Sequence, residues 1–284
     1  MISINHVSFE TGIQKILNDI SFVVPQNTCA ALLGPNGAGK STLIDIITGA
    51  IHPSEGEVRV SGKSFKDIRK RAGILFENPP MFYYSKVKEI IFYICTVYGI
   101  KQKDIQPLIR TLGIHDIMNK LTRVLSKGEK KKVGLLISLA HHPEVLILDE
   151  PGSGMDPFFR NELWSIIRSW PSTILFTTHI WEEAAKYADN VIFISKGSTL
   201  CCDTPDNLLS QKYTGFSHKV TIPKTGHMMT CLEQMQYMED ENSIHIFSNE
   251  PGRVVEVLGS EVAGYSVSEI SLMDVFMYLE RRQK

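Results

Sequence analysis

Net charge, cysteine and long apolar runs are all scarce in this chain, and each scarcity excludes a class of protein. Its 284 residues include 30 lysines and arginines against 31 aspartates and glutamates, a formal charge of −1 that argues against extended nucleic-acid binding. Five cysteines, an odd number with no Cys-x-x-Cys pair, favour a reducing cytosol over a disulfide scaffold. No signal-peptide layout follows Met1, and the longest apolar run, Ile90 to Ile100, is too short to span a bilayer. We therefore expect a chain that does not cross a membrane.

The most informative stretch that is present is rich in glycine and follows an apolar run from Ala30 to Leu33. It fits the pattern Gly, four residues, Gly-Lys-Ser/Thr in the order strand, loop, helix. Glycines let triphosphate oxygens approach backbone N–H groups, and the positive end of the following helix attracts the same anions. The Lys40 ammonium would contact the β- and γ-phosphates, and the Ser41 hydroxyl can bind Mg²⁺. The predicted phosphate-binding residues are Gly34, Pro35, Asn36, Gly37, Ala38, Gly39, Lys40, Ser41 and Thr42.

A second motif is an apolar run that ends in two acids, Val145 to Leu148 followed by Asp149 and Glu150. Its length and β-branched content favour a strand buried on both faces of a parallel sheet. Asp149, at the carboxyl end of this strand, can hold Mg²⁺ through water, and Glu150 is the better candidate for activating an attacking water. The alternative is an acidic strand end without chemistry, which the upstream phosphate loop disfavours.

Between these motifs lies the segment Leu125-Ser126-Lys127-Gly128-Glu129, which resembles the Leu-Ser-Gly-Gly-Gln signature of the ABC ATPase family. Two positions differ, a lysine for a glycine and a glutamate for the glutamine, whereas Ser126 and Gly128 are kept. Ser126 and Glu129 also form a capping-box pattern, which predicts the start of a helix over Lys130 to Ala140. A capped helix N-terminus is itself an anion site. The resemblance implies that Ser126, Gly128 and Glu129 face the γ-phosphate of an ATP held by the opposite subunit.

Two further elements follow in the family's order. The segment Ser153-Gly154-Met155-Asp156 resembles the D-loop, which crosses the dimer interface in this family. The buried-strand pattern from Thr173 ends at His179, where the family has its switch histidine. The resemblance implies that His179 contacts the γ-phosphate and the catalytic glutamate, here Glu150. It also implies a head-to-tail dimer that sandwiches ATP, formed by two copies or with a related ATPase subunit.

The chain departs from the family at the Gln-loop, where a glutamine usually binds Mg²⁺ and reports the nucleotide state to the membrane partner. Here Glu77 follows the strand pattern of Gly73 to Phe76. We expect its carboxylate to join Ser41 and Asp149 in binding Mg²⁺ and to add negative charge near the γ-phosphate.

Three other features leave alternatives open. The aromatic loop Met81 to Tyr84 is either a socket for a partner's helix or packed internally. The basic run Lys130 to Lys132 is interpreted as a solvated helix face, with contact to a partner or to lipid headgroups as the alternative. The usual adenine-stacking position holds Thr11, and Phe9 is the nearest ring, so the stacking residue is not identified.

The pattern of the whole chain predicts an α/β fold of the P-loop type, with an antiparallel β part, a helical subdomain and a small C-terminal α/β appendage. The expected nucleotide-binding domain spans 1–212, its helical subdomain about 82–140, and the appendage 213–284. Paired strands are expected over Ile2 to Val24, with Asn18-Asp19 near the turn, and helices over Lys86 to Leu121, broken at Gly99, Pro107 and Gly113. The remaining expected elements are strands at 54–62, 174–176, 191–194, 218–222, 243–247 and 266–270, and helices at 181–187, 254–258 and 272–281.

The appendage ends in Ser271-Leu272-Met273-Asp274-Val275-Phe276, which is similar to the tails of ABC-2 type exporter ATPases. A generic stabilising extension is the alternative. The resemblance as a whole implies an ATP-hydrolysing subunit of an ABC transporter, expected to be an exporter, at the cytoplasmic face of the membrane. Its implied partner is a membrane-spanning permease, and no nucleic acid is expected. The rival is a soluble single-cassette ATPase of an assembly or nucleic-acid process, and an importer ATPase is a third option.

Overall fold

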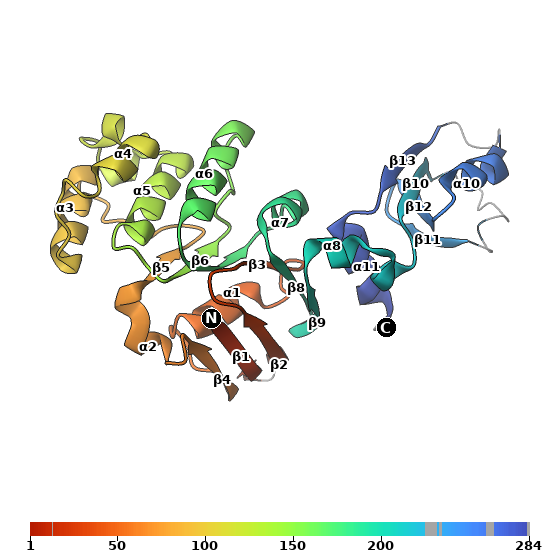
Figure 1. The fold of residues 1–284 in the computed structure, drawn as a ribbon, viewed down its shortest axis with the longest axis horizontal. Coiled ribbons are helices and arrows are strands. Elements are labelled where there is room, and N and C mark those ends of the chain that lie inside the picture. Colours follow the sequence, from red (N-terminus) through yellow and green to blue (C-terminus); the bar gives the residue numbers. More distant parts are fainter. Residues whose placement is uncertain (13, 225–231, 233–234, 260–263, 283–284) are drawn as a thin grey trace. The chain divides into compact units, whose positions relative to one another are not determined.

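The computed structural model describes residues 1–12, 14–224, 232, 235–259 and 264–282 (Figure 1). The chain divides into two compact units, Met1–Asp203 and Thr204–Lys284. This division falls earlier along the chain than the expected boundary between residues 212 and 213, because two short helices precede the strands of the second unit. They are α8 (Pro205–Leu209) and α9 (Gln211–Thr214).

A six-stranded sheet organises the first unit, in the order β5-β6-β7-β3-β8-β9. The pairs from β5 to β8 are parallel, and β9 is antiparallel to β8. Parallel strands end at one edge of the sheet, and in open α/β sheets ligands bind at that edge. The phosphate loop after β3 and the acids at the end of β6 therefore meet there. The strands are β3 (Cys29–Leu33), β5 (Ala72–Leu75), β6 (Val145–Asp149), β7 (Thr173–Thr177), β8 (Asn190–Ser195) and β9 (Ser198–Asp203).

An antiparallel sheet in the order β2-β1-β4 completes the unit, formed by β1 (Ile2–Thr11), β2 (Gln14–Val24) and β4 (Glu55–Val60). The expected turn near Asn18-Asp19 is wrong: both residues lie within β2, and the hairpin reverses at Gly12, which has φ 60°. Asp19 has φ 54°, and the pairing of the two strands shifts its register there. A bulge in the strand thus explains the turn-like residues.

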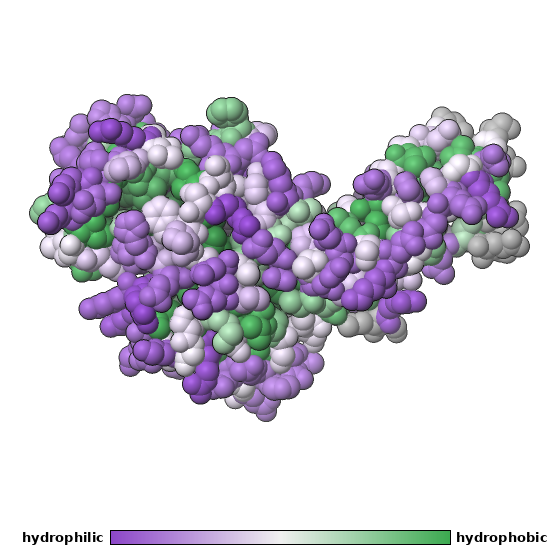
Figure 2. Space-filling view, viewed as in Figure 1, coloured by the Kyte–Doolittle hydropathy of each residue, from purple (hydrophilic) through white to green (hydrophobic). Residues whose placement is uncertain are grey.

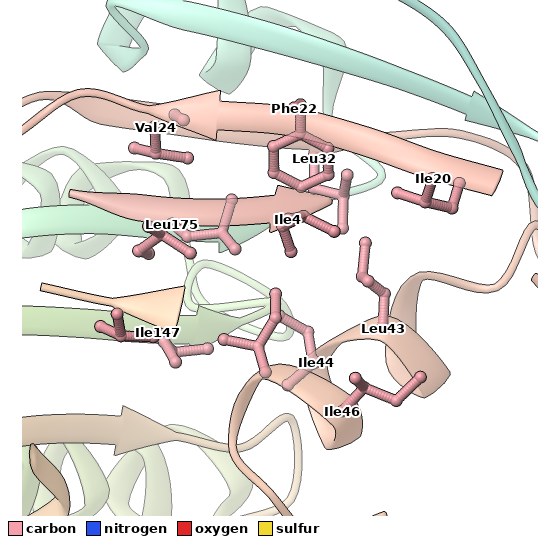
Figure 3. Close-up of a cluster of buried hydrophobic side chains, with 14 of the residues drawn as sticks. Ile4, Ile20, Phe22, Val24, Leu32, Leu43, Ile44, Ile46, Ile147 and Leu175 are labelled. Atoms are coloured by element: carbon pink, nitrogen blue, oxygen red, sulfur yellow. The ribbon is translucent and has the colours of Figure 1, made fainter. Parts of the chain in front are cut away.

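The main core lies between this antiparallel sheet, helix α1 (Lys40–Ile47) and the six-stranded sheet (Figure 3). Figure 3 shows Leu43 and Ile44 of α1 pointing toward Ile4, Leu32 and Ile147. All five side chains are at most 2% exposed. This packing fixes α1, and with it the phosphate loop, against the core of the unit.

Helices fill the long insertion between β5 and β6, as expected. They are α3 (Val87–Tyr98), α4 (Gln106–Thr111) and α5 (Lys127–Leu139), with short 3₁₀ turns at His115–Ile117 and Thr122–Val124. Gly99 ends α3 in a left-handed conformation, but Pro107 lies in the first turn of α4 instead of breaking a helix, because a proline there loses no helical hydrogen bond. Helix α5 begins at Lys127, not at Lys130. The other helices of this unit are α2 (Phe65–Ile68), α6 (Pro157–Ser169) and α7 (Trp181–Tyr187).

The second unit is an antiparallel sheet in the order β11-β12-β10-β13 with helices α8 to α11. The strands expected at 218–222, 243–247 and 266–270 are present, whereas β11 (Gln236–Glu239) was not expected. Asp274, 2% exposed, accepts a hydrogen bond from the Ser271 backbone N–H at 2.8 Å and pairs with Lys219 at 2.8 Å. The Ser271–Asp274 cap of the last helix is therefore confirmed. The remaining elements are β10 (His218–Pro223), β12 (Ser243–Ser248), β13 (Ser266–Glu269), α10 (Pro251–Leu258) and α11 (Leu272–Arg282).

Candidate nucleotide-binding and hydrolysis site

Two glycines of the phosphate loop leave no room for a side chain. Gly39 caps α1 at φ 100°, and a Cβ atom there would lie 2.5 Å from Cδ2 of Leu17. A Cβ atom at Gly34 would lie 2.1 Å from the carbonyl oxygen of Ile194. The ammonium of Lys40 donates hydrogen bonds to the carbonyl oxygens of Gly34 (2.7 Å) and Pro35 (3.0 Å). The lysine is thus held at the loop that begins its own helix.

A surface cavity of about 380 Å³ joins this loop to the acids of β6. Within it the structure brings together residues that lie far apart in the sequence, as the motifs predicted, including Glu77 at the Gln-loop position. Gln14 and Ile16 of β2 also line the cavity and were not expected, whereas Phe9 packs against the core. Their position directly after the Gly12 hairpin is the signal that could have identified them. The cavity is lined by Gln14, Ile16, Asn36, Gly37, Gly39, Lys40, Ser41, Thr42, Glu77, Asp149 and Glu150.

The two acids at the end of β6 are held by the neighbouring strand β7. The Thr177 hydroxyl donates to Asp149 at 2.5 Å, and the Glu150 N–H donates to the same hydroxyl oxygen at 3.0 Å. Glu150 has φ 51°, in the left-handed region that residues other than glycine rarely adopt. His179 lies two residues beyond β7, and its Nδ1 is 2.7 Å from Oε2 of Glu150. The predicted pairing of Glu150 with His179 is therefore present in the geometry.

The interpretation of the basic run Lys130 to Lys132 as a solvated helix face is wrong for Lys131. This lysine is 3% exposed, whereas Lys130 and Lys132 are partly exposed. Its ammonium donates to the carbonyl oxygen of Asp149 at 3.3 Å and to that of Glu150. Burial lowers the pKa of Lys131, and the carboxylates of Asp149, Glu77, Glu150 and Glu183 act in the opposite direction.

Lys40 is in a similar electrostatic environment. Burial lowers the pKa of its ammonium, and the carboxylates of Glu150 and Asp149 oppose that shift. Two cations, Lys40 and Lys131, thus share the carboxylates of the site. Their positive charge offsets part of the repulsion between these carboxylates.

The signature residues lie outside the cavity that contains Lys40. Ser126 caps α5: its hydroxyl accepts from the Glu129 N–H at 3.1 Å, and Oε2 of Glu129 accepts from the Ser126 N–H at 2.8 Å. The predicted capping box is confirmed. Glu129 also pairs with Lys120 at 2.8 Å, and this hydrogen bond lowers the pKa of its carboxyl. Gly128 is in the first turn of the same helix.

A partly buried ion pair connects the D-loop segment to the region of His179. Nε of Arg160 lies 3.4 Å from Oε1 of Glu183, which is 4% exposed. The guanidinium of Arg160 also donates to the carbonyl oxygen of Met155 at 3.2 Å, and the Thr178 hydroxyl donates to Glu183 at 2.8 Å. The sequence reasoning missed this pair, because an arginine and a glutamate on two helices carry no local pattern.

A glycine-rich phosphate loop and an Asp-Glu pair at one edge of a parallel sheet define a P-loop nucleotide hydrolase. The family described as ABC transporter matches residues 17–153. The lantibiotic transport ATP-binding protein SrtF of Streptococcus pyogenes is 34% identical over 205 residues, 70% of this chain and 89% of that protein. This chain therefore belongs to the ATP-binding subunits of ABC transporters, which bind ATP and hydrolyse it to power transport.

Two further comparisons agree with the family. The energy-coupling factor transporter ATP-binding protein EcfA of Methanocaldococcus jannaschii is 31% identical over 234 residues, 77% of this chain and 84% of that protein. A solved structure titled as the ATP binding subunit of an ABC transporter has a TM-score of 0.70 and 26% identity, covering 76% of this chain and 93% of that one. The expected fold is thereby confirmed. None of the helices in the described part of the chain has the length and apolar character needed to cross a bilayer.

Proposed function

We propose that this chain is the ATP-hydrolysing subunit of an exporter, in which Glu150 activates the attacking water and His179 contacts both Glu150 and the γ-phosphate. The contact that carries this proposal is the 2.7 Å distance between Nδ1 of His179 and Oε2 of Glu150, beside the cavity lined by Lys40 and Asp149. Hydrolysis of this kind depends on positioning and charge stabilisation around in-line attack. Lys40 binds the phosphates, and Glu150 accepts the proton of the water.

The donor set fits Mg²⁺. Ser41, Glu77 and Asp149 line one cavity and offer only oxygen atoms, which is the chemistry that Mg²⁺ prefers. Among the described residues, no group of three or more His, Cys, Asp and Glu side chains could hold a metal ion. Protein sites for Mg²⁺ commonly use one or two carboxylates together with substrate phosphates. When bound, Mg²⁺ would neutralise charge on the β- and γ-phosphate oxygens.

We further propose that the ATP-binding site is completed by a second ATPase subunit in a head-to-tail dimer. Ser126, Gly128 and Glu129 open helix α5 but do not line the cavity of their own chain. The N–H of Gly128 and the positive end of α5 suit a γ-phosphate held by another subunit, whereas the N–H groups of Ser126 and Glu129 are engaged in the capping box. Mixing Ser126→Arg subunits with Lys40→Ala subunits gives heterodimers with one intact site, so partial hydrolysis should return. No recovery in demonstrably mixed dimers would contradict the composite site.

A membrane-spanning permease is the proposed partner, with this chain bound at the cytoplasmic face. In the loop Met81 to Tyr84, the exposed fractions are 62% for Phe82, 67% for Tyr83 and 80% for Tyr84, which favours a socket over internal packing. Figure 2 shows green apolar surface among purple residues over the region of α3 to α5.

We assign Met1–Asp203 as the nucleotide-binding domain, with its helical subdomain at about 82–140, and Thr204–Lys284 as the accessory domain. The exporter-like tail supports the direction of transport.

Glu150→Gln tests the proposal. Turnover should fall about 10²- to 10⁴-fold, the usual contribution of an acid–base group, while ATP binding persists and a closed dimer accumulates on size-exclusion chromatography. Glu182→Gln, the same change at an exposed position of α7, is the matched control. Activity of Glu150→Gln within about twofold of wild type would remove Glu150 as the base. Co-purification of a membrane protein from detergent extracts tests the partner, and a chain recovered free of membranes would favour the soluble alternative.

A further inference from the structure

The chemistry described so far assigns no role to the buried lysine of α5, Lys131, although its ammonium contacts the backbone of Asp149 and Glu150. Lys131, which is 3% exposed, is the one buried lysine in the described part of the chain. An enclosed ammonium loses its hydration, so it persists only where hydrogen bonds and opposite charges replace water. Here the replacements are the carbonyl oxygens of Asp149 and Glu150, the last residue of β6 and the residue after it.

Two glycines bring α5 close enough for this contact. A Cβ atom at Gly73 of β5 would lie 2.1 Å from the carbonyl oxygen of Ser138, and one at Gly134 would lie 2.8 Å from side-chain atoms of Leu75 and Pro79. Side chains at these positions would push the helix away from the sheet. Lys131 is three residues before Gly134, one turn of helix away on the same face. The lysine therefore reaches the strand end because the helix lies against β5.

The contact completes a clamp on the backbone of Glu150. Its N–H donates to the hydroxyl oxygen of Thr177 at 3.0 Å, and its carbonyl oxygen accepts from Lys131. Glu150 is held at φ 51°, a conformation that needs support from its surroundings. With both peptide groups fixed, the side chain leaves the backbone in one direction. That direction takes Oε2 to within 2.7 Å of His179.

We propose that Lys131 is a positioning residue for hydrolysis, whose ammonium fixes the backbone carbonyls of Asp149 and Glu150 and thereby aims the Glu150 carboxylate. This inference rests on the proposed role of Glu150 as the base. Lys131 itself touches neither ATP nor water in this scheme. Since small misplacements of a catalytic group cost up to about 10²-fold in rate, its loss should be visible in kcat.

Lys131→Met keeps most of the side-chain volume and removes the ammonium. In the purified full chain with saturating Mg²⁺-ATP, we expect kcat to fall about 10- to 100-fold, while ATP affinity changes less than about threefold. Lys131→Arg keeps the charge and the N–H donors and should recover part of the rate. Lys132→Met is the matched control, because that lysine lies 4.0 Å over the Phe159 ring and should keep the wild-type rate.

A double-mutant cycle separates positioning from a general loss of structure. If Lys131 acts through Glu150, adding Lys131→Met to Glu150→Gln should cost almost nothing more in single-turnover hydrolysis of radiolabelled ATP. A full additional loss in that background would overturn the proposal, as would a Lys131→Met rate within about twofold of wild type. If Lys131→Met does not fold, Lys131→Gln replaces it, and failure of both to fold would assign Lys131 to folding instead. An active Glu150→Gln would instead overturn the proposed function itself.

Discussion

The left-handed backbone of Glu150 makes a prediction about stability that is independent of transport. At φ 51°, the backbone of a residue other than glycine is strained by roughly 1–2 kcal/mol, whereas glycine adopts this region freely. Glu150→Gly and Glu150→Ala both remove the carboxylate and its contact with His179. The glycine variant should therefore be more stable than the alanine variant by about 1 kcal/mol.

An exposed helical position supplies a matched pair of glycine and alanine variants, whose expected difference in stability has the opposite sign. Glu162 lies in the middle of α6, where glycine is less stable than alanine by about 1 kcal/mol. Comparing the two Gly–Ala differences cancels the extra freedom that glycine has in the unfolded chain. The expected contrast between positions 150 and 162 is about 2 kcal/mol. For a unit of this size, each 1 kcal/mol corresponds to about 2–4 °C in Tm.

Tryptophan fluorescence during urea unfolding measures this contrast in the first unit alone. All three tryptophans, Trp164, Trp170 and Trp181, lie in Met1–Asp203. The unfolding of Thr204–Lys284 therefore adds no tryptophan signal. If Glu150→Ala proves as stable as Glu150→Gly while the Glu162 pair behaves as expected, the backbone at residue 150 is not strained, and the clamp by Lys131 and Thr177 loses its purpose.

Three further predictions concern the metal, the partner and acid stability. Glu77→Gln should raise the Mg²⁺ concentration needed for half-maximal hydrolysis, because it removes a carboxylate from the proposed metal site, and superimposable metal titrations would mean that Glu77 points away from the metal. Tyr83→Asp should leave ATP binding intact and release the chain from membranes in a sedimentation assay, whereas retention would move the docking surface elsewhere. Burial raises the pKa of Asp189, but the hydrogen bonds from Arg168 and the Cys29 N–H outweigh it and lower that pKa below 3.8. The stability difference between wild type and Asp189→Asn should thus be constant above about pH 5 and shrink as acid protonates the folded carboxyl; a difference that grows on acidification would contradict this linkage.

Features encoded within a few neighbouring residues could be predicted from the sequence. The phosphate loop, the acids that end β6, the Ser126–Glu129 capping box and the bounds of α7 all depend on local backbone geometry, on side-chain caps or on a continuous apolar run. Such patterns are legible because each residue's requirement is met by neighbours in the chain. The order of these motifs then gave the family resemblance, and the comparisons confirmed it.

The tertiary structure decided which residues of these elements face the site. Lys131 stands in a run of three lysines, and only the packing of α5 against Gly73 turns it inward while Lys130 and Lys132 stay partly exposed. Gln14 and Ile16 enter the cavity because the β-hairpin reverses at Gly12 and its second strand passes the phosphate loop. Gly12 marks the turn in the sequence, but which residues of β2 then meet the phosphate loop depends, like the inward position of Lys131, on contacts between segments far apart in the sequence, whose geometry is set by close packing of the whole unit.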